Sequence, residues 1–447
     1  MTKRILRNFC ITVFGFTAVG GFLISRTPGL SATTSSAVKD NSEWQCGREQ
    51  NSKTINVVCP PYNAVPDDTQ DDAKAFQSAV DSLPSSGGVI RIPPGTYLFN
   101  RPLIILKPVH LLGAGPPTIL SHQVELSTDG QANFIRIGGA GPVTENVTIS
   151  DLTMQSPRRD DLRTVMIRIV NNVDGVKIRN VAFRNVASTC VLLFGSNIRN
   201  IDVSENRADE FYEQFVELAS AGITGVRIER NVAKSTRGHP KLGPTEPFGV
   251  VFEPKIPGEI SDVSIVGNLF SFDGMSMSEL VNTGGVSLST GPTSPLLYRR
   301  ILIKDNIIRT TGVGIRVQLL RSGGAGGPGS VDITGNRIEG ATSHGILVTG
   351  GSDLTHRDAV SITGNIIRGY SAQAYYQYDG IRLDGNLVKP EIKGNQILPL
   401  KDGAQGIGRY GISIEPGVKM PVITDNKVAG YRDGAISNKS INENVDK

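Results

Sequence analysis

The sequence predicts an all-β protein: a right-handed single-stranded parallel β-helix of roughly ten coils with an N-terminal capping helix. Three observations predict this fold. A strand unit ending in Asn recurs along the chain, a second, Gly-led strand unit lies between the Asn positions, and an amphipathic helix precedes the repeats. The 447 residues include 51 Gly, one Trp and only 6% aromatic residues, as expected of a turn-rich β protein.

The first unit alternates apolar and polar residues and favours Val and Ile, which is typical of strands. Each Asn is expected in a tight turn, because Asn tolerates the left-handed backbone conformation. Stacked turns are also expected to form a ladder of Asn hydrogen bonds. The unit ends at Asn180, Asn206, Asn231, Asn268, Asn306, Asn336, Asn365, Asn395 and Asn426.

The second unit begins with Gly, as in Gly345–Val348, and a short third strand follows each Asn, as in Ile366–Ile367. Three strands in ~30 residues, with no helical period between them, make one coil of a parallel β-solenoid with right-handed crossovers. A leucine-rich repeat is the alternative solenoid. Val and Ile in place of Leu, and Gly-rich segments where that repeat needs a helix, favour the β-helix.

The chain before the repeats contains a helix signal and a strand signal. Asp71–Leu83 has apolar residues at helical spacing and acidic residues at its first turn, so we expect an amphipathic helix that covers the open end of the stack. Gly87–Tyr97 then reads as a strand, a Pro-Gly turn and another strand.

Residues 1–32 are predicted to be a signal peptide, because a basic start is followed by the apolar run Phe9–Ile24. An uncleaved anchor is the alternative. Residues 33–61 form an extension in which Cys46 and Cys59 are expected to close a disulfide in an oxidising compartment. Residues 62–436 are assigned to the β-helix and 437–447 to a polar tail. We therefore expect a secreted or periplasmic protein without stable membrane insertion after cleavage.

The charge balance excludes one class of partner. The chain has 46 Lys and Arg, four of them in residues 1–32, which contain no acid, so 42 basic residues face 42 acidic residues in the remainder. A neutral body argues against nucleic-acid binding driven by phosphate neutralisation.

Three segments carry a family resemblance: Tyr62–Ala79 with its Asp67-Asp68-Thr69, then Ile92–Tyr97, then Leu111–Gly115. Together they resemble the opening of pectate-lyase-superfamily proteins, although Val65–Asp67 stands where that family has Gly-Asp-Gly. The resemblance implies that a substrate lies along the sheet built from the Gly-led strands. It leaves the chemistry open, because this fold hosts lyases, epimerases, hydrolases and phage tailspikes. The acidic motifs of polygalacturonases and the Asp-Pro-His motif of mannuronan epimerases are absent from the sequence.

Functional groups concentrate on the last three coils. His344, Asp379 and Tyr410 each precede the Gly of a strand, so they are expected to be neighbours on successive rungs. Arg382 points outward on the same sheet. For proton abstraction next to a uronate carboxylate, we assign Arg382 as the carboxylate clamp and His344 as a base oriented by Asp379. Tyr410 is assigned as the acid.

Asp384 and Glu415 are expected one rung apart, where two carboxylates repel unless a cation, a proton or Arg382 lies between them. They are the predicted ligands of Ca²⁺, the one cofactor that the sequence suggests. Tyr375, Tyr376 and Tyr378 are predicted to bind sugar rings. A looser substrate-binding cluster is expected from Arg316, Glu217 and Glu253. For each charged residue the alternative is an ordinary solvated surface position.

These residues indicate a carbohydrate-active protein whose partner is an acidic polysaccharide. The leading hypothesis is a lyase or a C5-epimerase that removes the proton α to a uronate carboxylate. One alternative is a glycoside hydrolase using paired carboxylates. Another is a non-catalytic β-helix that binds or organises polysaccharide.

Overall fold

The computed structural model describes residue 46 and residues 53–122, 133–156, 164–237, 247–254, 258–289, 296–319, 329–351, 359–371, 377–399 and 408–440. The chain divides into two compact units, Met1–Asn41 and Ser42–Lys447, and every described residue belongs to the second. The predicted signal peptide therefore lies outside the described residues. Within the described part of the chain, no helix has the length and apolar character needed to cross a bilayer.

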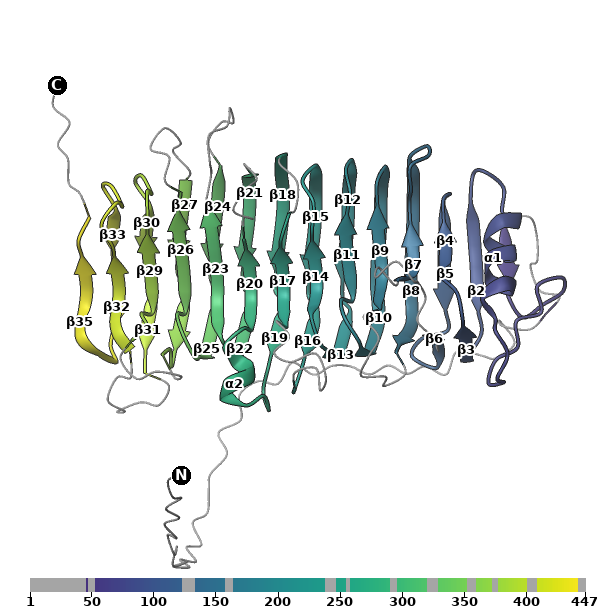
Figure 1. Cartoon of the computed structure of the whole chain (residues 1–447), viewed down its shortest axis with the longest axis horizontal. Helices are drawn as coiled ribbons and strands as arrows, with labels where there is room; N and C mark the ends of the chain where they lie inside the picture. Colours follow the sequence, from purple (N-terminus) through teal and green to yellow (C-terminus); the bar gives the residue numbers. More distant parts are fainter. Residues whose placement is uncertain are drawn as a thin grey trace, which may run out of the picture. The chain divides into compact units, whose positions relative to one another are not determined.

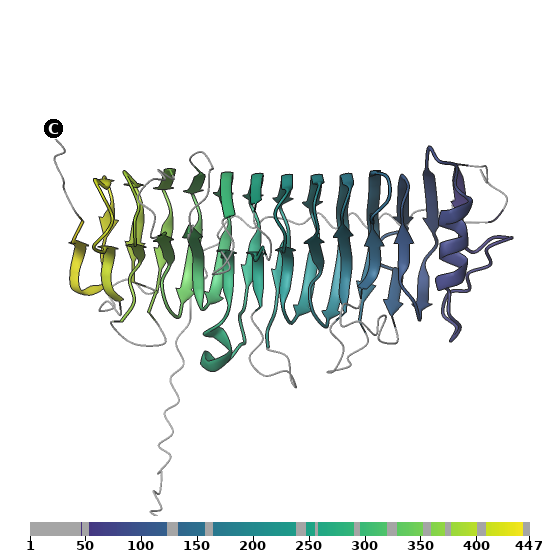
Figure 2. The ribbon, with the colours of Figure 1, turned by 45° about the horizontal axis from the view of Figure 1, so that its top comes forward.

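Three rows of parallel strands stack coil upon coil in the second unit (Figures 1 and 2). The first row is a 12-stranded sheet, which we call sheet B. Its strands are β4 (Leu103–Ile105), β7 (Asn133–Ile137), β9 (Val165–Val170), β11 (Val191–Phe194), β14 (Gln214–Leu218), β17 (Phe248–Phe252), β20 (Gly284–Leu288), β23 (Val313–Leu319), β26 (Ile346–Gly350), β29 (Ile381–Asp384), β32 (Gly408–Ile414) and β35 (Tyr431–Asn438).

The other two rows form one 23-stranded sheet, because β8 and β10 run through both of them. The second row is β1 (Thr54–Asn56), β2 (Gly88–Ile92), β5 (Val109–Gly113), β8 (Thr144–Gln155), β10 (Val173–Val186), β12 (Ile198–Ser204), β15 (Ile223–Glu229), β18 (Gly258–Val266), β21 (Leu296–Lys304), β24 (Ser330–Thr334), β27 (Ala359–Thr363), β30 (Glu391–Lys393) and β33 (Val422–Thr424). The third row shares β8 and β10 and adds β3 (Gly95–Phe99), β6 (Thr118–His122), β13 (Arg207–Phe211), β16 (Val232–Lys234), β19 (Leu269–Ser271), β22 (Ile307–Thr311), β25 (Arg337–Ala341), β28 (Ile366–Arg368), β31 (Gln396–Leu398) and β34 (Lys427–Val428).

The predicted parallel β-helix is confirmed. Sheet B has twelve rungs among the described residues where the repeats predicted about ten coils. The additional rungs lie before Asn180, where the sequence lacks the Asn-ended unit. Strands also extend past both predicted boundaries of the β-helix, from Thr54 in β1 to Asn438 in β35.

The core is the inside of the coil, where the inward side chains of all three rows meet. One residue from each row illustrates this: Ile333, Ile338 and Ile346 are fully buried. Because strand side chains alternate between faces, the intervening residues point outward. The outward face of sheet B is where the predicted site residues lie.

The predicted Asn ladder is present and lines the inside of one turn. Each buried Asn is linked in the same way to the coil before it and to the coil after it. The Asn306 side-chain amide donates to Ile265 O (2.8 Å) and to Asn336 Oδ1 (2.9 Å). Its own Oδ1 accepts the backbone N–H (3.0 Å) and the side-chain amide (2.9 Å) of Asn268. Every polar atom of this buried amide is therefore satisfied from inside the protein.

The backbone conformation of this turn differs from the prediction. The left-handed residue is the one before the ladder Asn, such as Glu205 (φ 59°) before Asn206 or Gly335 (φ 66°) before Asn336. Asn180 is itself left-handed (φ 53°) and exposed, because Arg179 pairs with Ser204 and Asn180 therefore aligns with Glu205. The ladder consequently begins at Asn206, whose side chain accepts the Val181 N–H (3.0 Å).

Two helices are described: α1 (Ala73–Ser82) and the short α2 (Met277–Leu280). The predicted amphipathic helix is α1, which lies beside the first strands (Figure 1). Its Phe76 packs edge-on against Tyr97 and Phe99, with ring centroids 5.3 and 4.9 Å apart. The acidic residues expected in the first turn lie before α1, which begins at Ala73. Asp72 takes the N-cap position, but its side chain caps no N–H of the helix. Its carboxylate accepts the N–H groups of Val65 (2.9 Å) and Leu98 (3.0 Å) and so fastens the preceding loop to β3.

The predicted disulfide is present. Cys46 and Cys59 form a disulfide with their Cα atoms 5.6 Å apart. Cys190 is fully buried next to β11, and burial raises the pKa of its thiol well above the usual value. It is therefore a packing residue, not a nucleophile.

We expect Asn306→Ala to lower the free energy of unfolding by roughly 2–5 kcal/mol. The substitution removes the hydrogen-bond partner of three buried groups: Ile265 O, the Asn268 N–H and the Asn268 side-chain amide. The matched control is Asn180→Ala, an exposed Asn outside the ladder whose side-chain amide donates to Asp151 Oδ1 (3.4 Å). Its expected cost is below about 1.5 kcal/mol. Urea unfolding followed by circular dichroism measures both, and equal losses would contradict the ladder as a source of stability.

Candidate functional site

Strand register places the predicted residues in columns on the outward face of sheet B. Leu347 pairs with Arg382 and Arg382 with Ser413, and Thr349 pairs with Asp384. At the start of each strand, the Gly345 N–H donates to Asp379 O and the Gly380 N–H donates to Tyr410 O. His344, Asp379 and Tyr410 therefore lie on successive rungs, as the repeat predicted.

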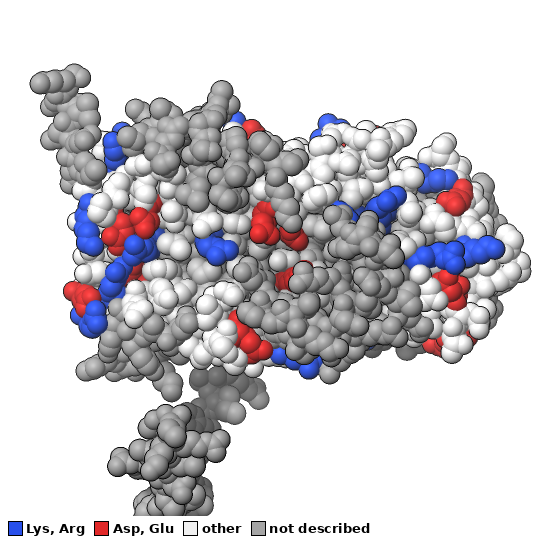
Figure 3. Space-filling view, in the orientation of Figure 1, with Lys and Arg blue, Asp and Glu red and all other residues white. Residues whose placement is uncertain are grey.

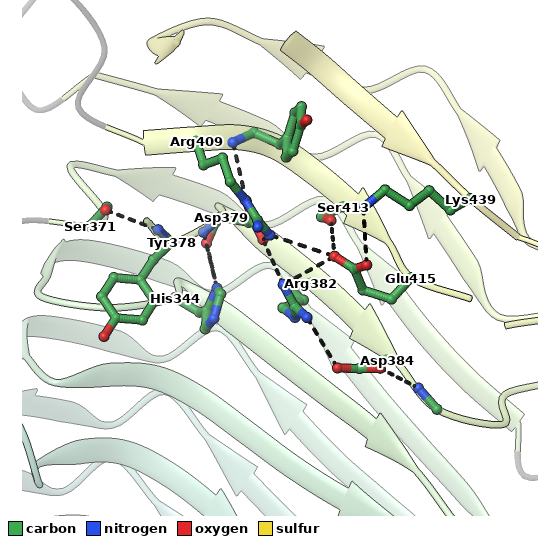
Figure 4. Close-up of polar contacts among 12 residues, drawn as sticks. His344, Ser371, Tyr378, Asp379, Arg382, Asp384, Arg409, Ser413, Glu415 and Lys439 are labelled. Carbon is green, nitrogen blue, oxygen red and sulfur yellow. Dashed lines mark hydrogen bonds and ion pairs between the residues drawn. The ribbon is translucent and has the colours of Figure 1, made fainter. Parts of the chain in front are cut away.

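Six charged side chains gather at this end of sheet B, and we call them the C-terminal charge cluster (Figure 4). They lie on β29 and β32 or within two residues of the ends of β29, β32 and β35. Acidic and basic side chains lie close together over this end of the surface (Figure 3). The members are Asp379, Arg382, Asp384, Arg409, Glu415 and Lys439.

Asp379 is the centre of the cluster and is fully buried. Its carboxylate accepts Nε (3.0 Å) and Nη2 (2.6 Å) of Arg409, and also the backbone N–H of Tyr410 (3.1 Å). Arg382 Nη1 lies 3.6 Å from the same carboxylate. A buried carboxylate requires such partners, because transferring a lone charge from water costs far more than folding can supply.

Arg382 occupies the position between the two stacked carboxylates. Its guanidinium contacts Glu415 at 3.1 Å and Asp384 at 3.2 Å. A cation, a proton or Arg382 was expected to relieve the repulsion between Asp384 and Glu415. In the structure Arg382 lies between them and pairs with both. Among the described residues, no group of three or more His, Cys, Asp or Glu side chains is placed to hold a metal ion.

Glu415 is nearly buried and accepts hydrogen bonds from Ser413 Oγ (2.9 Å) and Lys439 Nζ (3.3 Å). Burial alone would raise its pKa. The Ser413 hydrogen bond and the charges of Arg382 and Lys439 outweigh burial, so the pKa of Glu415 lies below its ordinary value. This carboxylate is therefore ionised at neutral pH.

His344 is also nearly buried, and its environment keeps it neutral. Asp379 O lies 3.3 Å from His344 Nδ1, and the backbone N–H of Asp379 donates to the same nitrogen at the shorter distance of 3.0 Å. This hydrogen bond favours the tautomer with its proton on Nε2. Burial lowers the pKa of His344 to about 4, with the positive charges of Arg382 and Arg409 acting in the same direction. Asp379 contacts His344 through its backbone, because the Asp379 carboxylate binds Arg409.

Two tyrosines border the cluster. The Tyr378 ring meets His344 edge-on with centroids 5.1 Å apart, and Ser371 Oγ accepts the Tyr378 N–H (3.1 Å). The Arg409 guanidinium lies 5.2 Å from the centre of the Tyr410 ring. The predicted sugar-binding residues Tyr375 and Tyr376 lie outside the described residues.

The looser cluster predicted from Glu217, Glu253 and Arg316 is not brought together by the described contacts. Glu217 and Arg316 share a column but lie three rungs apart, with Val251 and Ser287 between them. Glu253 is exposed. Arg316 instead donates from Nε to Ser287 Oγ (2.9 Å) and stacks on Phe248.

Sequence reasoning missed two members of the charge cluster, Arg409 and Lys439. Arg409 lies two positions before Gly411, one residue outside the columns that the repeat defined. Lys439 follows β35, and its N–H donates to Ile414 O (2.9 Å), so it continues the column of Asp384 and Glu415 by one rung. Extending the repeat one coil past Asn426 would have found it.

Two family descriptions match this chain. Residues 54–216 match "Rhamnogalacturonase A/epimerase, pectate lyase-like", and residues 166–366 match "Right handed beta helix region". Each description covers less than half of the chain, and the two overlap at residues 166–216. The family resemblance seen in the sequence is confirmed, and with it the right-handed coil.

Solved structures with the same fold belong to proteins named as an epimerase, a glucanase and an adhesin. The A-module of mannuronan C-5 epimerase AlgE4 from Azotobacter vinelandii has a TM-score of 0.57 and 17% identity, over 87% of this chain and 99% of that chain. The catalytic unit of a GH87 α-1,3-glucanase from Streptomyces thermodiastaticus has a TM-score of 0.53 and 17% identity, over 89% of this chain and 70% of that chain. PfbA, a surface adhesin of Streptococcus pneumoniae, has a TM-score of 0.52 and 13% identity, over 88% of this chain and 93% of that chain. At such identities the likeness shows the fold alone.

Two curated proteins match short parts of the chain. They are the DeoD-type 1 purine nucleoside phosphorylase of Shewanella oneidensis, 25% identical over 127 residues, and the DeoD-type enzyme of Aliivibrio fischeri, 30% identical over 131 residues. The chain spans about half the length of these relatives (52% and 53%), and each match takes in little more than a quarter of this chain.

The lowered pKa of His344 predicts a stability change with pH. The unfolded chain binds a proton at the ordinary pKa near 6.5, and the folded protein does so only near 4. Stability from neutral His344 is therefore complete above pH 6.5 and is lost as the pH falls towards 4, by about 3 kcal/mol in all.

The variant His344→Asn isolates this effect, because the Asn side-chain oxygen can accept the Asp379 N–H and does not titrate. Urea unfolding of both proteins between pH 7 and pH 4 should show their difference in unfolding free energy falling as the pH falls. Parallel curves would show that His344 is not held neutral.

Proposed function

We propose that this protein is a secreted or periplasmic enzyme acting on an acidic polysaccharide, by elimination or by C5-epimerisation next to a uronate carboxylate. The observation that carries the proposal is the arrangement around Asp379 on sheet B: its backbone N–H holds His344, and its carboxylate is bound by Arg382 and Arg409. The fold is also that of proteins named as an epimerase and a glucanase. Both proposed reactions begin with removal of the proton α to the carboxylate.

Arg382 is the group that would receive the substrate carboxylate. Its pair with Asp384 is accessible, since the Asp384 side chain is 41% exposed and accepts one 3.2 Å hydrogen bond from Arg382 and one of 2.8 Å from the Gly385 N–H. Exposed ion pairs contribute little to stability, so a substrate carboxylate can replace Asp384 at small cost. Binding Arg382 withdraws charge from the carboxylate and acidifies the neighbouring C–H.

His344 and Tyr410 would supply the hydrogen-bond donor and the proton transfer. In the tautomer described above, His344 offers Nε2–H, which can donate to the enediolate that forms as the proton leaves. We therefore assign His344 as a neutral donor in place of the base that the sequence suggested. Tyr410, whose ring lies against Arg409, is assigned as the group that takes the C5 proton, acting as phenolate, and then returns it: to the departing glycosidic oxygen in elimination, or through water to the opposite face of C5 in epimerisation. Binding of Ca²⁺ by Asp384 and Glu415 stays a prediction, for which loss of activity in EDTA is the check.

Hydrolysis by paired carboxylates is less well supported. A retaining pair needs one protonated carboxyl as general acid. Here Arg382 lies between Asp384 and Glu415, and the pKa of Glu415 is lowered, not raised.

The test is incubation with polymannuronate, alginate and polygalacturonate. Elimination appears as ultraviolet absorbance of unsaturated ends, and epimerisation as deuterium at C5 in D₂O. We expect His344→Asn to lower kcat about 100-fold or more, because one donor to the developing negative charge is lost. The control Arg337→Gln, an exposed residue of β25 in the other sheet, should keep the full rate.

Other outcomes identify the alternatives. Reducing ends without new absorbance or deuterium would establish hydrolysis and reject the proposal. Polysaccharide binding without any product would indicate a non-catalytic β-helix.

A further inference from the structure

A column of three outward side chains extends from the C-terminal charge cluster along sheet B. Arg316, Leu347 and Arg382 lie on successive strands β23, β26 and β29, paired residue to residue. All three are partly exposed. The column therefore presents a positive charge, an apolar side chain and a second positive charge, one on each rung.

The first of these charges is held in place from two sides. Arg316 Nε donates to Ser287 Oγ (2.9 Å), and its guanidinium lies 5.3 Å from the centre of the Phe248 ring. Phe248 itself is buried in a small apolar cluster on this outward face, against which Leu347 packs. A guanidinium stacked on an aromatic face keeps its orientation and loses little entropy on binding an anion.

The neighbouring column is suited to hydroxyl groups. Gln318, Thr349 and Asp384 are paired across the same three strands and are also partly exposed. The first two are uncharged donors and acceptors, and Asp384 is an acceptor. Each rung thus combines one side chain of the first column with one hydrogen-bonding side chain of the second.

We propose that these three rungs bind three consecutive sugars of an extended β-(1→4)-linked uronan, with Arg316 as a second carboxylate-binding residue. The inference rests on the proposed function in one respect: Arg382 binds a uronate carboxylate. Arg316 then binds the carboxylate two sugars away, and Leu347 faces the ring between them.

The spacing of the two arginines selects the shape of the chain. Two rungs span ~9.6 Å along the sheet. In an extended two-fold uronan each sugar advances by about one rung and successive rings turn over, so carboxylates on one side recur at every second sugar. In a galacturonate chain that winds with a three-fold screw, carboxylates on one side recur at every third sugar, so they do not match two arginines that lie two rungs apart. The column therefore favours β-(1→4)-linked mannuronate over α-(1→4)-linked galacturonate.

The test is binding of mannuronate oligomers of two, three and four sugars, measured by calorimetry. The background is His344→Asn, so that the ligands stay intact. Affinity should rise about tenfold from the disaccharide to the trisaccharide, as one more charge-assisted contact forms. In Arg316→Met, which keeps an apolar stem on Phe248, that rise should vanish while disaccharide binding is unchanged. Galacturonate oligomers should show no such rise, and Arg337→Gln is the control.

The outcomes separate this inference from the proposed function. If turnover occurs but Arg316→Met binds all lengths as its parent does, or weakens all lengths equally, the three-sugar site is wrong and the enzyme stands. If no turnover is found but the length-dependent loss appears, the binding site stands and the proposed chemistry is wrong. Absence of binding by every uronate oligomer overturns both.

Discussion

Parallel pairing between coils, residue opposite residue, is the constraint on which the rest of this structure depends. The backbone hydrogen bonds from one coil to the next hold side chains that are about thirty positions apart in vertical columns. The buried Asn ladder keeps this register at one turn, because each amide satisfies polar groups of the coils before and after it. A slip of one residue would turn inward side chains outward and break every step of the ladder.

The same register that builds the core also concentrates charge. Stacking Asp384 under Glu415 brings like charges close together, and burial of Asp379 removes a carboxylate from water. Arg382 and Arg409 compensate both, and Lys439 completes the balance at three positive and three negative groups. Such a network is costly to break, because each lost partner leaves a poorly solvated charge. Within it His344 stays neutral, so this end of sheet B combines fixed charges with a hydrogen-bond donor that does not ionise near pH 7.

Much of this arrangement could be read from the repeat. The column containing Leu347, Arg382 and Ser413 follows from the Gly-led units alone, since each unit places the same positions outward. Local side-chain geometry could not be read in this way. Asp72 had the features of a helix cap yet binds backbone groups of a neighbouring loop and strand. Asn180 matched the repeat but lies one position out of register with the ladder.

By itself the sequence determined the architecture: parallel coils, an inward apolar face, an Asn ladder, and the stacking of His344, Asp379 and Tyr410. These features repeat, and repetition makes them visible as a period. Only the tertiary structure decided which atoms meet: that Arg409 takes the Asp379 carboxylate, that Arg382 separates Asp384 from Glu415, and that a backbone N–H sets the tautomer of His344. Such contacts depend on side-chain direction and burial at single positions, and a period in the sequence contains no information on either.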